Sequence, residues 1–159
     1  MYKGDLKMKL QAGDKAPLFR LQSSDGSEFA LQDLLSKNVI VYFYPKDNTP
    51  GCTIEAKDFS ALLESFAAKD YVIVGISPDS PKCHQNFIAK QNLKILLLSD
   101  TDKSVASAYG AYGTKMMYGK EVQGIIRSTF IIGKDGVIKQ SFYNVKAKDH
   151  AQKVLESLE

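Results

Sequence analysis

Hydrophobic and polar residues along this chain form strand-like and helix-like patterns in alternation. Residues 39–44 are apolar at every position and rich in β-branched and aromatic side chains, which predicts a central strand covered on both faces. Similar runs over 71–77 and 95–99 predict two more strands. Helix-spaced apolar residues predict helices over about 50–68 and 80–91. Strands that alternate with helices imply crossover connections and a parallel core.

Hairpins are predicted near both ends of this pattern. Two short alternating segments around the turn SSDG predict a β-hairpin from about 19 to 31. Later, the strand GIIRSTFIIG (124–133) turns at KDG and pairs back through VIKQSFY (137–143). Between these hairpins, a short helix near 104–109 leads into the Gly- and Tyr-rich stretch 109–124, which we interpret as a long loop. An amphipathic helix follows the second hairpin.

These elements predict one α/β domain over residues 1–159, with a mixed central sheet flanked by helices and an N-terminal β-hairpin. No repeat, low-complexity tract or linker divides the sequence. Parallel strands followed by a hairpin and a closing helix are thioredoxin-like in layout. A chain of 159 residues buries roughly two-thirds of its unfolded surface, so the fold needs no disulfide or metal.

Composition and charge exclude several functions. Hydrophobic residues make up 44% and charged residues 25%, and no apolar run approaches the roughly 20 residues that span a bilayer, so we expect no membrane contact. The 21 Lys and Arg residues are dispersed among 18 acidic ones, which argues against nucleic acid. The start MYKGDLKMKLQAGDKAP lacks a secretory signal, so a cytoplasmic protein is expected. Without an extended C-terminal arm, we also expect a monomer.

The chain has two cysteines, Cys52 and Cys83. In a reducing compartment such cysteines are catalytic, redox-active or simply buried more often than disulfide-bonded. No C-x-x-C spacing is present, and we expect no metal site.

Cys52 follows the turn PKDNTPG at a predicted helix start. Thr49 suits the N-cap, where its hydroxyl can accept a backbone NH, and Pro50 suits the first helical position. Cys52 is then the third helical residue, where free NH groups and the helix dipole favour an anion, so the thiolate is stabilised. Its spacing from Ala56 and Phe59 turns it toward the sheet. The alternative is a small buried cysteine that acts only as a hydrophobe.

Arg127 interrupts an apolar strand. A buried guanidinium is costly unless an anion pairs with it, and Glu55 or the Cys52 thiolate could be that anion. An exposed Arg127 in a surface ion pair is the alternative. We expect His84 and His150 to be ordinary residues at helix surfaces or boundaries.

The segment around Cys52 resembles the active-site signature P-x-x-x-T/S-x-x-C of the peroxiredoxins. YFYPKDNTPGCTIEAKDF and GIIRSTFIIGKDG are similar to the bacterioferritin-comigratory or Q class, and the resemblance extends from AGDKAPLFRL to the last helix. It implies a thioredoxin-like fold and a peroxidase for hydrogen peroxide and organic hydroperoxides. It also implies thioredoxin or another thiol as the reductant, with no metal or organic cofactor.

The resemblance also implies residue roles. Cys52 matches the peroxidatic cysteine, which attacks the peroxide and becomes a sulfenic acid. Thr49 matches the hydroxyl that hydrogen-bonds the peroxide, and Arg127 the arginine that activates the thiol and polarises the O–O bond. Pro45 matches the residue that shields the site from water, and Glu55 the glutamate that orients Arg127.

One departure from the family pattern concerns the resolving cysteine. Lys57 and Ile88 occupy the two positions where relatives of this class carry it, so Cys83 is the only internal partner. A disulfide needs Cα atoms within about 7 Å, which would require local unwinding. Alternatively, Cys83 is a bystander and an outside thiol reduces the sulfenic acid directly. A redox sensor or holdase partner without efficient turnover is the rival function.

Overall fold

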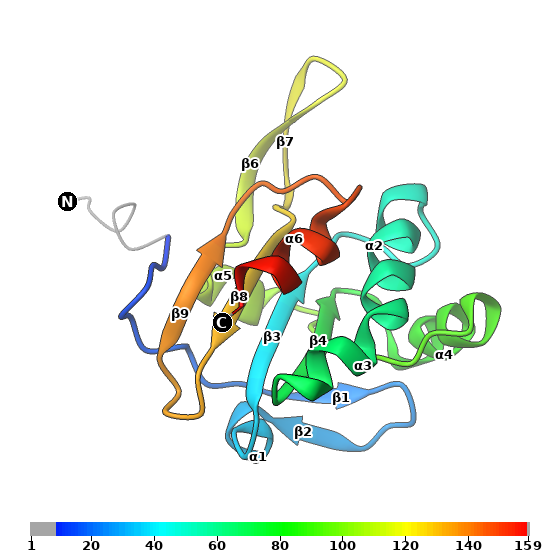
Figure 1. The fold of residues 1–159 in the computed structure, drawn as a ribbon. Helices are drawn as coiled ribbons and strands as arrows, with labels where there is room; N and C mark the ends of the chain where they lie inside the picture. The colour runs from blue at the N-terminus through cyan, green and yellow to red at the C-terminus, as the bar shows by residue number, and fades with distance from the viewer. Residues whose placement is uncertain (1–8, 159) are drawn as a thin grey trace.

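The computed structural model describes residues 9–158; residues 1–8, part of the segment interpreted as lacking a secretory signal, and residue 159 lie outside the described residues. A seven-stranded mixed sheet with the order β2-β1-β5-β4-β3-β8-β9 forms the centre (Figure 1). β4 pairs in parallel with β3 and β5, and β3 pairs antiparallel with β8. The strands are β1 (Arg20–Ser23), β2 (Glu28–Ala30), β3 (Asn38–Phe43), β4 (Tyr71–Ser77), β5 (Leu96–Ser99), β8 (Ser128–Ile132) and β9 (Ile138–Phe142).

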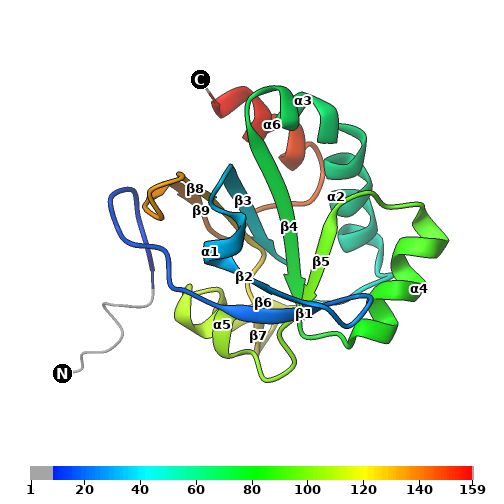
Figure 2. The same ribbon diagram turned by 90° about the horizontal axis from the view of Figure 1, so that it is seen from below.

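Helices cover both faces of this sheet (Figure 2). One face carries α2 (Pro50–Ala61), α3 (Leu63–Ala68), α4 (Pro81–Gln91) and α6 (His150–Ser157), and the other carries α1 (Leu31–Leu34) and α5 (Ser104–Ala108). β3 is central because its side chains alternate between two cores: Ile40 and Tyr42 point to the α2 side, and Val41 points to the α5 side. All three are fully buried, as predicted for this strand.

The predicted helix over 50–68 is two helices. α2 ends at Ala61, and Leu62 leaves the helical conformation with φ −97° and ψ 6° before α3 begins. Neither Gly nor Pro marks this break, so the apolar pattern gave no sign of it. Phe59 and Phe66, on either side of the break, lie in one core with their ring centroids 5.9 Å apart.

The stretch 109–124 is not a loop. β6 (Tyr112–Met117) and β7 (Lys120–Ile125) form an antiparallel hairpin that projects from the body of the molecule (Figure 1). Its turn residues Tyr118 and Gly119 both have positive φ, 54° and 80°, as in a two-residue type I′ turn. The prediction was wrong because a tyrosine at positive φ is uncommon, which hid the turn.

The predicted strand over 124–133 is also interrupted. β7 ends at Ile125 and β8 begins at Ser128, so Arg127 lies in a two-residue break where the hairpin joins the sheet. The main chain here is still bonded, because Val145 N donates to the Arg127 carbonyl at 3.0 Å. Leaving the strand lets the Arg127 side chain keep 17% of its surface exposed. Within residues 9–158, no helix is both long and apolar enough to cross a membrane.

Candidate active site

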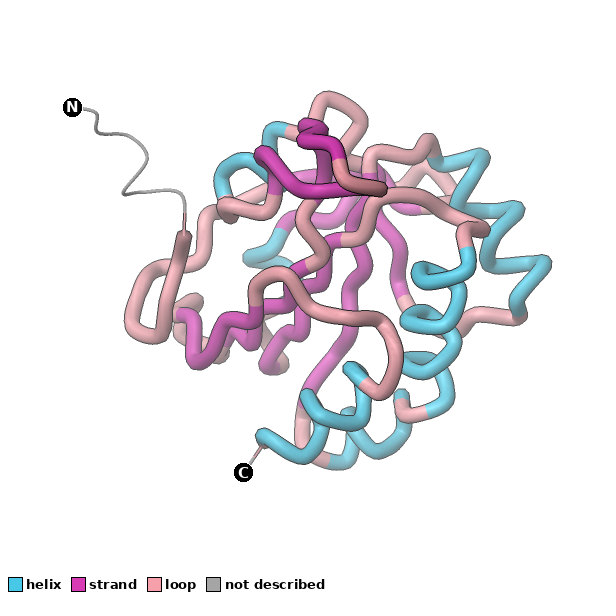
Figure 3. Tube along the Cα trace, turned by 90° about the horizontal axis from the view of Figure 1, so that it is seen from above, coloured by secondary structure: helices cyan, strands magenta, loops and turns pink. Residues whose placement is uncertain are grey.

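Cys52 is the third residue of α2. This helix begins on the side of the molecule to which the β6–β7 hairpin projects (Figure 1), the side that faces the viewer in Figure 3. Thr49 is the N-cap and Pro50 the first helical residue, as predicted. Cys52 is only 1% exposed and belongs to the same core as Ala56 and Phe59. The predicted orientation toward the sheet is confirmed, and the thiol lies where the positive end of the helix dipole favours an anion.

Thr49 does not cap α2 with its side chain as predicted. Its hydroxyl instead donates to the carbonyl oxygen of Lys46 at 2.7 Å, while its backbone carbonyl accepts the first helical bond from Thr53 N. The turn before the helix uses the hydroxyl hydrogen, so the oxygen of Thr49 keeps its accepting lone pairs. The hydroxyl oxygen can therefore still accept a hydrogen bond, three residues before Cys52 in the chain.

Arg127 joins the two candidate anions. Its Nη1 donates to Glu55 Oε1 at 2.6 Å, and its Nη2 donates to Cys52 Sγ at 3.4 Å. Glu55 follows Cys52 by three residues on α2, the spacing that puts two side chains on one helix face. The Glu55 side chain is fully buried, so the alternative of an exposed surface pair is wrong.

Burial shifts the pKa values of Glu55 and Arg127. It raises the pKa of Glu55 to about 7, although Arg127 opposes the shift. Burial by itself lowers the pKa of Arg127, but the neighbouring Glu55 and Cys52 outweigh it and raise the pKa overall. Glu55 Oε2 has no hydrogen-bond partner among residues 9–158. The guanidinium therefore stays charged, and its partner carboxyl holds it through one oxygen.

Gly51 makes room for Arg127. A Cβ at Gly51 would lie 3.2 Å from Arg127 Nη2 and 3.8 Å from the Cβ of Ala147. Our reading of the sequence missed this residue. The available signal was a glycine inside the first turn of a helix, where it costs about 1 kcal/mol relative to alanine.

The remaining two candidates lie outside this contact. Pro45 is half-buried and comes two residues after the end of β3. Cys83 is exposed and is the third residue of α4, where its backbone NH donates to Ser80 Oγ at 3.2 Å. Both cysteines are free, so the structure does not join Cys83 to Cys52. α2 and α4 do cover the same face of the sheet.

Both histidines are buried, so the prediction of surface positions was wrong, although His150 does lie at a helix boundary, as the first residue of α6. His84 Nδ1 lies 2.7 Å from Asp47 Oδ2, and His150 Nε2 lies 2.7 Å from Thr129 Oγ1. Burial lowers the pKa of His150 to about 4, and Arg127 adds to the shift. For His84 the sequence held a signal, because the apolar Phe87 follows at the i+3 position on the same helix face.

Comparison with known proteins agrees with this geometry. The family model AhpC/TSA matches residues 12–141. The Helicobacter pylori (strain J99) protein named putative peroxiredoxin bcp is 63% identical over 150 residues, which cover 94% of this chain and 99% of the relative. Peroxiredoxin Bcp of Bacillus subtilis is 45% identical over 151 residues, 95% of this chain and 96% of the relative. A solved structure of the Xanthomonas campestris bacterioferritin comigratory protein superposes with a TM-score of 0.83 at 42% identity, covering 88% of this chain and 89% of that one.

These similarities extend over most of the chain and over most of each relative. The fold is the thioredoxin-like fold of the peroxiredoxins, which confirms the predicted fold class. The chain therefore belongs to the AhpC/TSA family, among its bacterioferritin-comigratory peroxiredoxins, and is a thiol peroxidase.

Proposed function

We propose that Cys52 is the peroxidatic residue and that it reduces hydrogen peroxide and organic hydroperoxides through a sulfenic acid. The observation that carries this proposal is the guanidinium of Arg127, which contacts Cys52 Sγ and Glu55 Oε1 together. A fixed cation next to a buried thiol stabilises negative charge where the reaction needs it. Alkyl peroxide reduction is the activity named for the Xanthomonas campestris relative, which supports organic hydroperoxides as substrates.

The chemical step transfers one oxygen atom to sulfur. The Cys52 thiolate attacks the nearer peroxide oxygen, the O–O bond breaks, and Cys52 becomes S–OH while the departing oxygen takes a proton to leave as water or alcohol. Arg127 stabilises the charge on sulfur and on the departing oxygen, and Glu55 holds the guanidinium in place. The Thr49 hydroxyl accepts a hydrogen bond from the peroxide, and Pro45 shields the thiol from water.

Cys83 is the proposed resolving residue. Attack of its thiol on the Cys52 sulfenic acid forms a disulfide and releases water, and a dithiol such as thioredoxin then reduces the disulfide by exchange. Because Cys83 is exposed and Cys52 is buried, one or both helix starts must move before the sulfur atoms meet. Direct reduction of the sulfenic acid by an outside thiol is the competing route.

Turnover coupled to thioredoxin, thioredoxin reductase and NADPH tests the enzyme. We expect peroxide-dependent NADPH oxidation that Cys52→Ser abolishes and that Cys83→Ser slows, because Cys83 is the proposed resolving residue. Full turnover in Cys52→Ser would overturn the assignment of Cys52. Stoichiometric oxidation of Cys52 without repeated turnover would instead favour a redox sensor or holdase partner.

Intact mass after equimolar peroxide, with a sulfenic-acid trap present, tests the resolving step. A Cys52–Cys83 disulfide makes the monomer lighter by two hydrogen atoms and protects both thiols from alkylation. A trapped adduct on Cys52 with a free Cys83 would remove the resolving role, and a doubled mass would show a bond between chains.

A further inference from the structure

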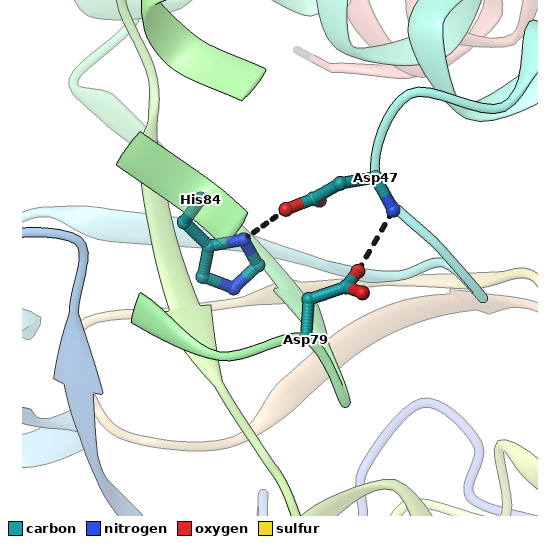
Figure 4. A group of neighbouring side chains, drawn as sticks. All are labelled: Asp47, Asp79 and His84. Carbon is teal, nitrogen blue, oxygen red and sulfur yellow. Dashed lines mark hydrogen bonds and ion pairs between the residues drawn. The ribbon is translucent and has the colours of Figure 1, made fainter. Parts of the chain in front are cut away.

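A polar cluster outside the contact described above links the segment before α2 to the first turn of α4. Figure 4 shows three of its members: Asp47 and His84, which are buried, and Asp79, which is half-buried. His84 Nδ1 lies 2.7 Å from Asp47 Oδ2, and the backbone N of Asp47 donates to Asp79 Oδ2 at 2.7 Å. Tyr44 and Ser77 complete it, since the Tyr44 hydroxyl donates to Asp47 Oδ1 at 2.6 Å and Ser77 Oγ donates to Asp79 Oδ2 at 2.8 Å. We call these five residues the Asp47 network.

The contact between His84 and Asp47 contains one proton. His84 Nε2 lies 3.0 Å from the carbonyl oxygen of Leu98, which only accepts, so this nitrogen carries a hydrogen. Nδ1 faces a carboxylate oxygen, and a bond at that distance needs one hydrogen between the two atoms. The Asp47 and His84 side chains are 4% and 0% exposed, so this bond lies in a low-dielectric interior that strengthens it.

The same residues resemble a metal site, because Asp47, Asp79 and His84 offer ligand atoms within 4.8 Å of one another. Their contacts favour hydrogen bonding instead. His84 Nδ1 and Asp47 Oδ2 bond each other, and Asp79 Oδ2 already accepts from Asp47 N and from Ser77 Oγ. A cation held by His84 Nδ1 would have to displace the bond between His84 and Asp47.

The network joins the two segments that would have to move for a disulfide. Asp47 lies in the connection between β3 and α2, two residues before the N-cap Thr49. His84 lies in the first turn of α4, directly after Cys83. The exposed thiol of Cys83 is therefore next in sequence to a side chain anchored in the interior.

We propose that the bond between His84 and Asp47 acts as a latch. It fixes the first turn of α4 to the connection before α2 and sets the rate at which Cys83 reaches the oxidised Cys52. His84 is a positioning residue here, because it acts on Cys83 through the helix and touches no reacting atom. The latch rests on the proposed resolving role of Cys83. Oxidation of Cys52 requires no movement of α4, whereas disulfide formation requires the latch to open.

His84→Gln tests the latch, with Asn86→Gly as its matched control. Asn86 is exposed on α4, and glycine is a poorer helix former than asparagine, so this change loosens the helix without touching the network. Rapid quenching and mass analysis give the rate of Cys52 oxidation, the rate of disulfide formation and the sulfinic fraction at high peroxide. Hydrogen exchange of the amides in the first turn of α4 is measured alongside.

For His84→Gln we expect unchanged oxidation of Cys52, disulfide formation faster by about tenfold, and a smaller sulfinic fraction. Asn86→Gly should accelerate the disulfide less. An unchanged or slower disulfide step in His84→Gln, or equal acceleration by both variants, would overturn the latch. If the wild type forms no Cys52–Cys83 disulfide, the resolving role of Cys83 fails, and hydrogen exchange alone then tests the latch. First-turn amides of α4 that exchange no faster in His84→Gln than in Asn86→Gly would overturn it.

Discussion

Gly51 has no side chain, and this absence leaves room for the guanidinium of Arg127. Its hydrogen atom leaves Arg127 Nη2 space that a Cβ would occupy at 3.2 Å. We expect Gly51→Ala to push the guanidinium away by a few tenths of an ångström and slow Cys52 oxidation several-fold. Stability should be equal or higher, because alanine is the better helix former by about 1 kcal/mol. Stopped-flow peroxide kinetics and urea unfolding check both halves, and undiminished oxidation would show that Arg127 adapts freely.

Substitution of Arg127 itself should slow the oxidation of Cys52 more than Gly51→Ala does. Removing one fixed donor from a reacting anion costs about 10²-fold in rate, so Arg127→Ala should slow the reaction of Cys52 with peroxide by that order. Arg127→Lys keeps the charge but loses the fork that reaches Glu55 and Cys52 together, so it should also be slow. Circular dichroism should show both variants folded, and wild-type kinetics in either would remove the guanidinium from the mechanism.

Tyr42 and Tyr44 offer a matched pair of buried hydroxyls. The Tyr42 hydroxyl has no hydrogen-bond partner among residues 9–158, whereas the Tyr44 hydroxyl donates to Asp47. We expect Tyr42→Phe to raise the free energy of unfolding by about 1 kcal/mol, because an unsatisfied polar group leaves the core. Tyr44→Phe should lower it by a similar amount. Chemical denaturation measures both, and equal effects of the two substitutions would contradict this explanation.

The residue-scale features divide into those that local sequence determines and those that it does not. Thr49, Pro50 and Cys52 could be placed because a helix start depends on neighbouring residues. Arg127 could be predicted to need an anion, but the distance to Glu55 spans 72 positions and depends on the assembled sheet. Asp47 and His84 were missed for the same reason, since their contact spans 37 positions.

Among the elements, we expect the docking of α6 on the sheet to depend on pH through His150. Its pKa is lowered to about 4 by burial, and an unfolded histidine has a pKa of 6.5. Between these values the unfolded chain binds more protons, so the free energy of unfolding falls as pH decreases from 6.5 to 4.

Comparison with His150→Gln isolates this effect. The stability advantage of the wild type over the variant should shrink by on the order of 2 kcal/mol between pH 7 and pH 4. Urea unfolding at a series of pH values measures it, and a constant difference would mean that His150 titrates alike in both states.

Element boundaries followed the sequence where periodicity was strong and departed from it where geometry depended on distant partners. β3 and β4 were predicted closely because strands buried on both faces leave an uninterrupted apolar run. The break at Leu62 and the hairpin of β6 and β7 were not predicted, because neither Gly nor Pro marks the first and a tyrosine at positive φ forms the turn of the second.

At the scale of the whole molecule, β3 connects two cores that lie on opposite faces of one sheet. Ile40→Ala and Val41→Ala change adjacent positions that point into different cores, and each should lower the free energy of unfolding by about 2–4 kcal/mol. If residues 1–159 are one domain, as proposed, both variants unfold in a single transition seen alike by circular dichroism and by thiol exposure of Cys52. Separate transitions for the two cores would refute that proposal.

Sedimentation of the same samples tests the predicted monomer, and cell fractionation tests the predicted cytoplasmic location.

The contact between Arg127 and Cys52 also has a consequence for protein synthesis. The two residues are 75 positions apart, and the strand that follows Arg127 pairs with β3 across the centre of the sheet. At about 5–20 residues per second, a ribosome exposes Cys52 several seconds before Arg127 exists. A nascent chain therefore carries a thiol without its cation, and if Arg127 activates Cys52 as proposed, rapid reaction with peroxide begins only when translation has supplied Arg127 and β8.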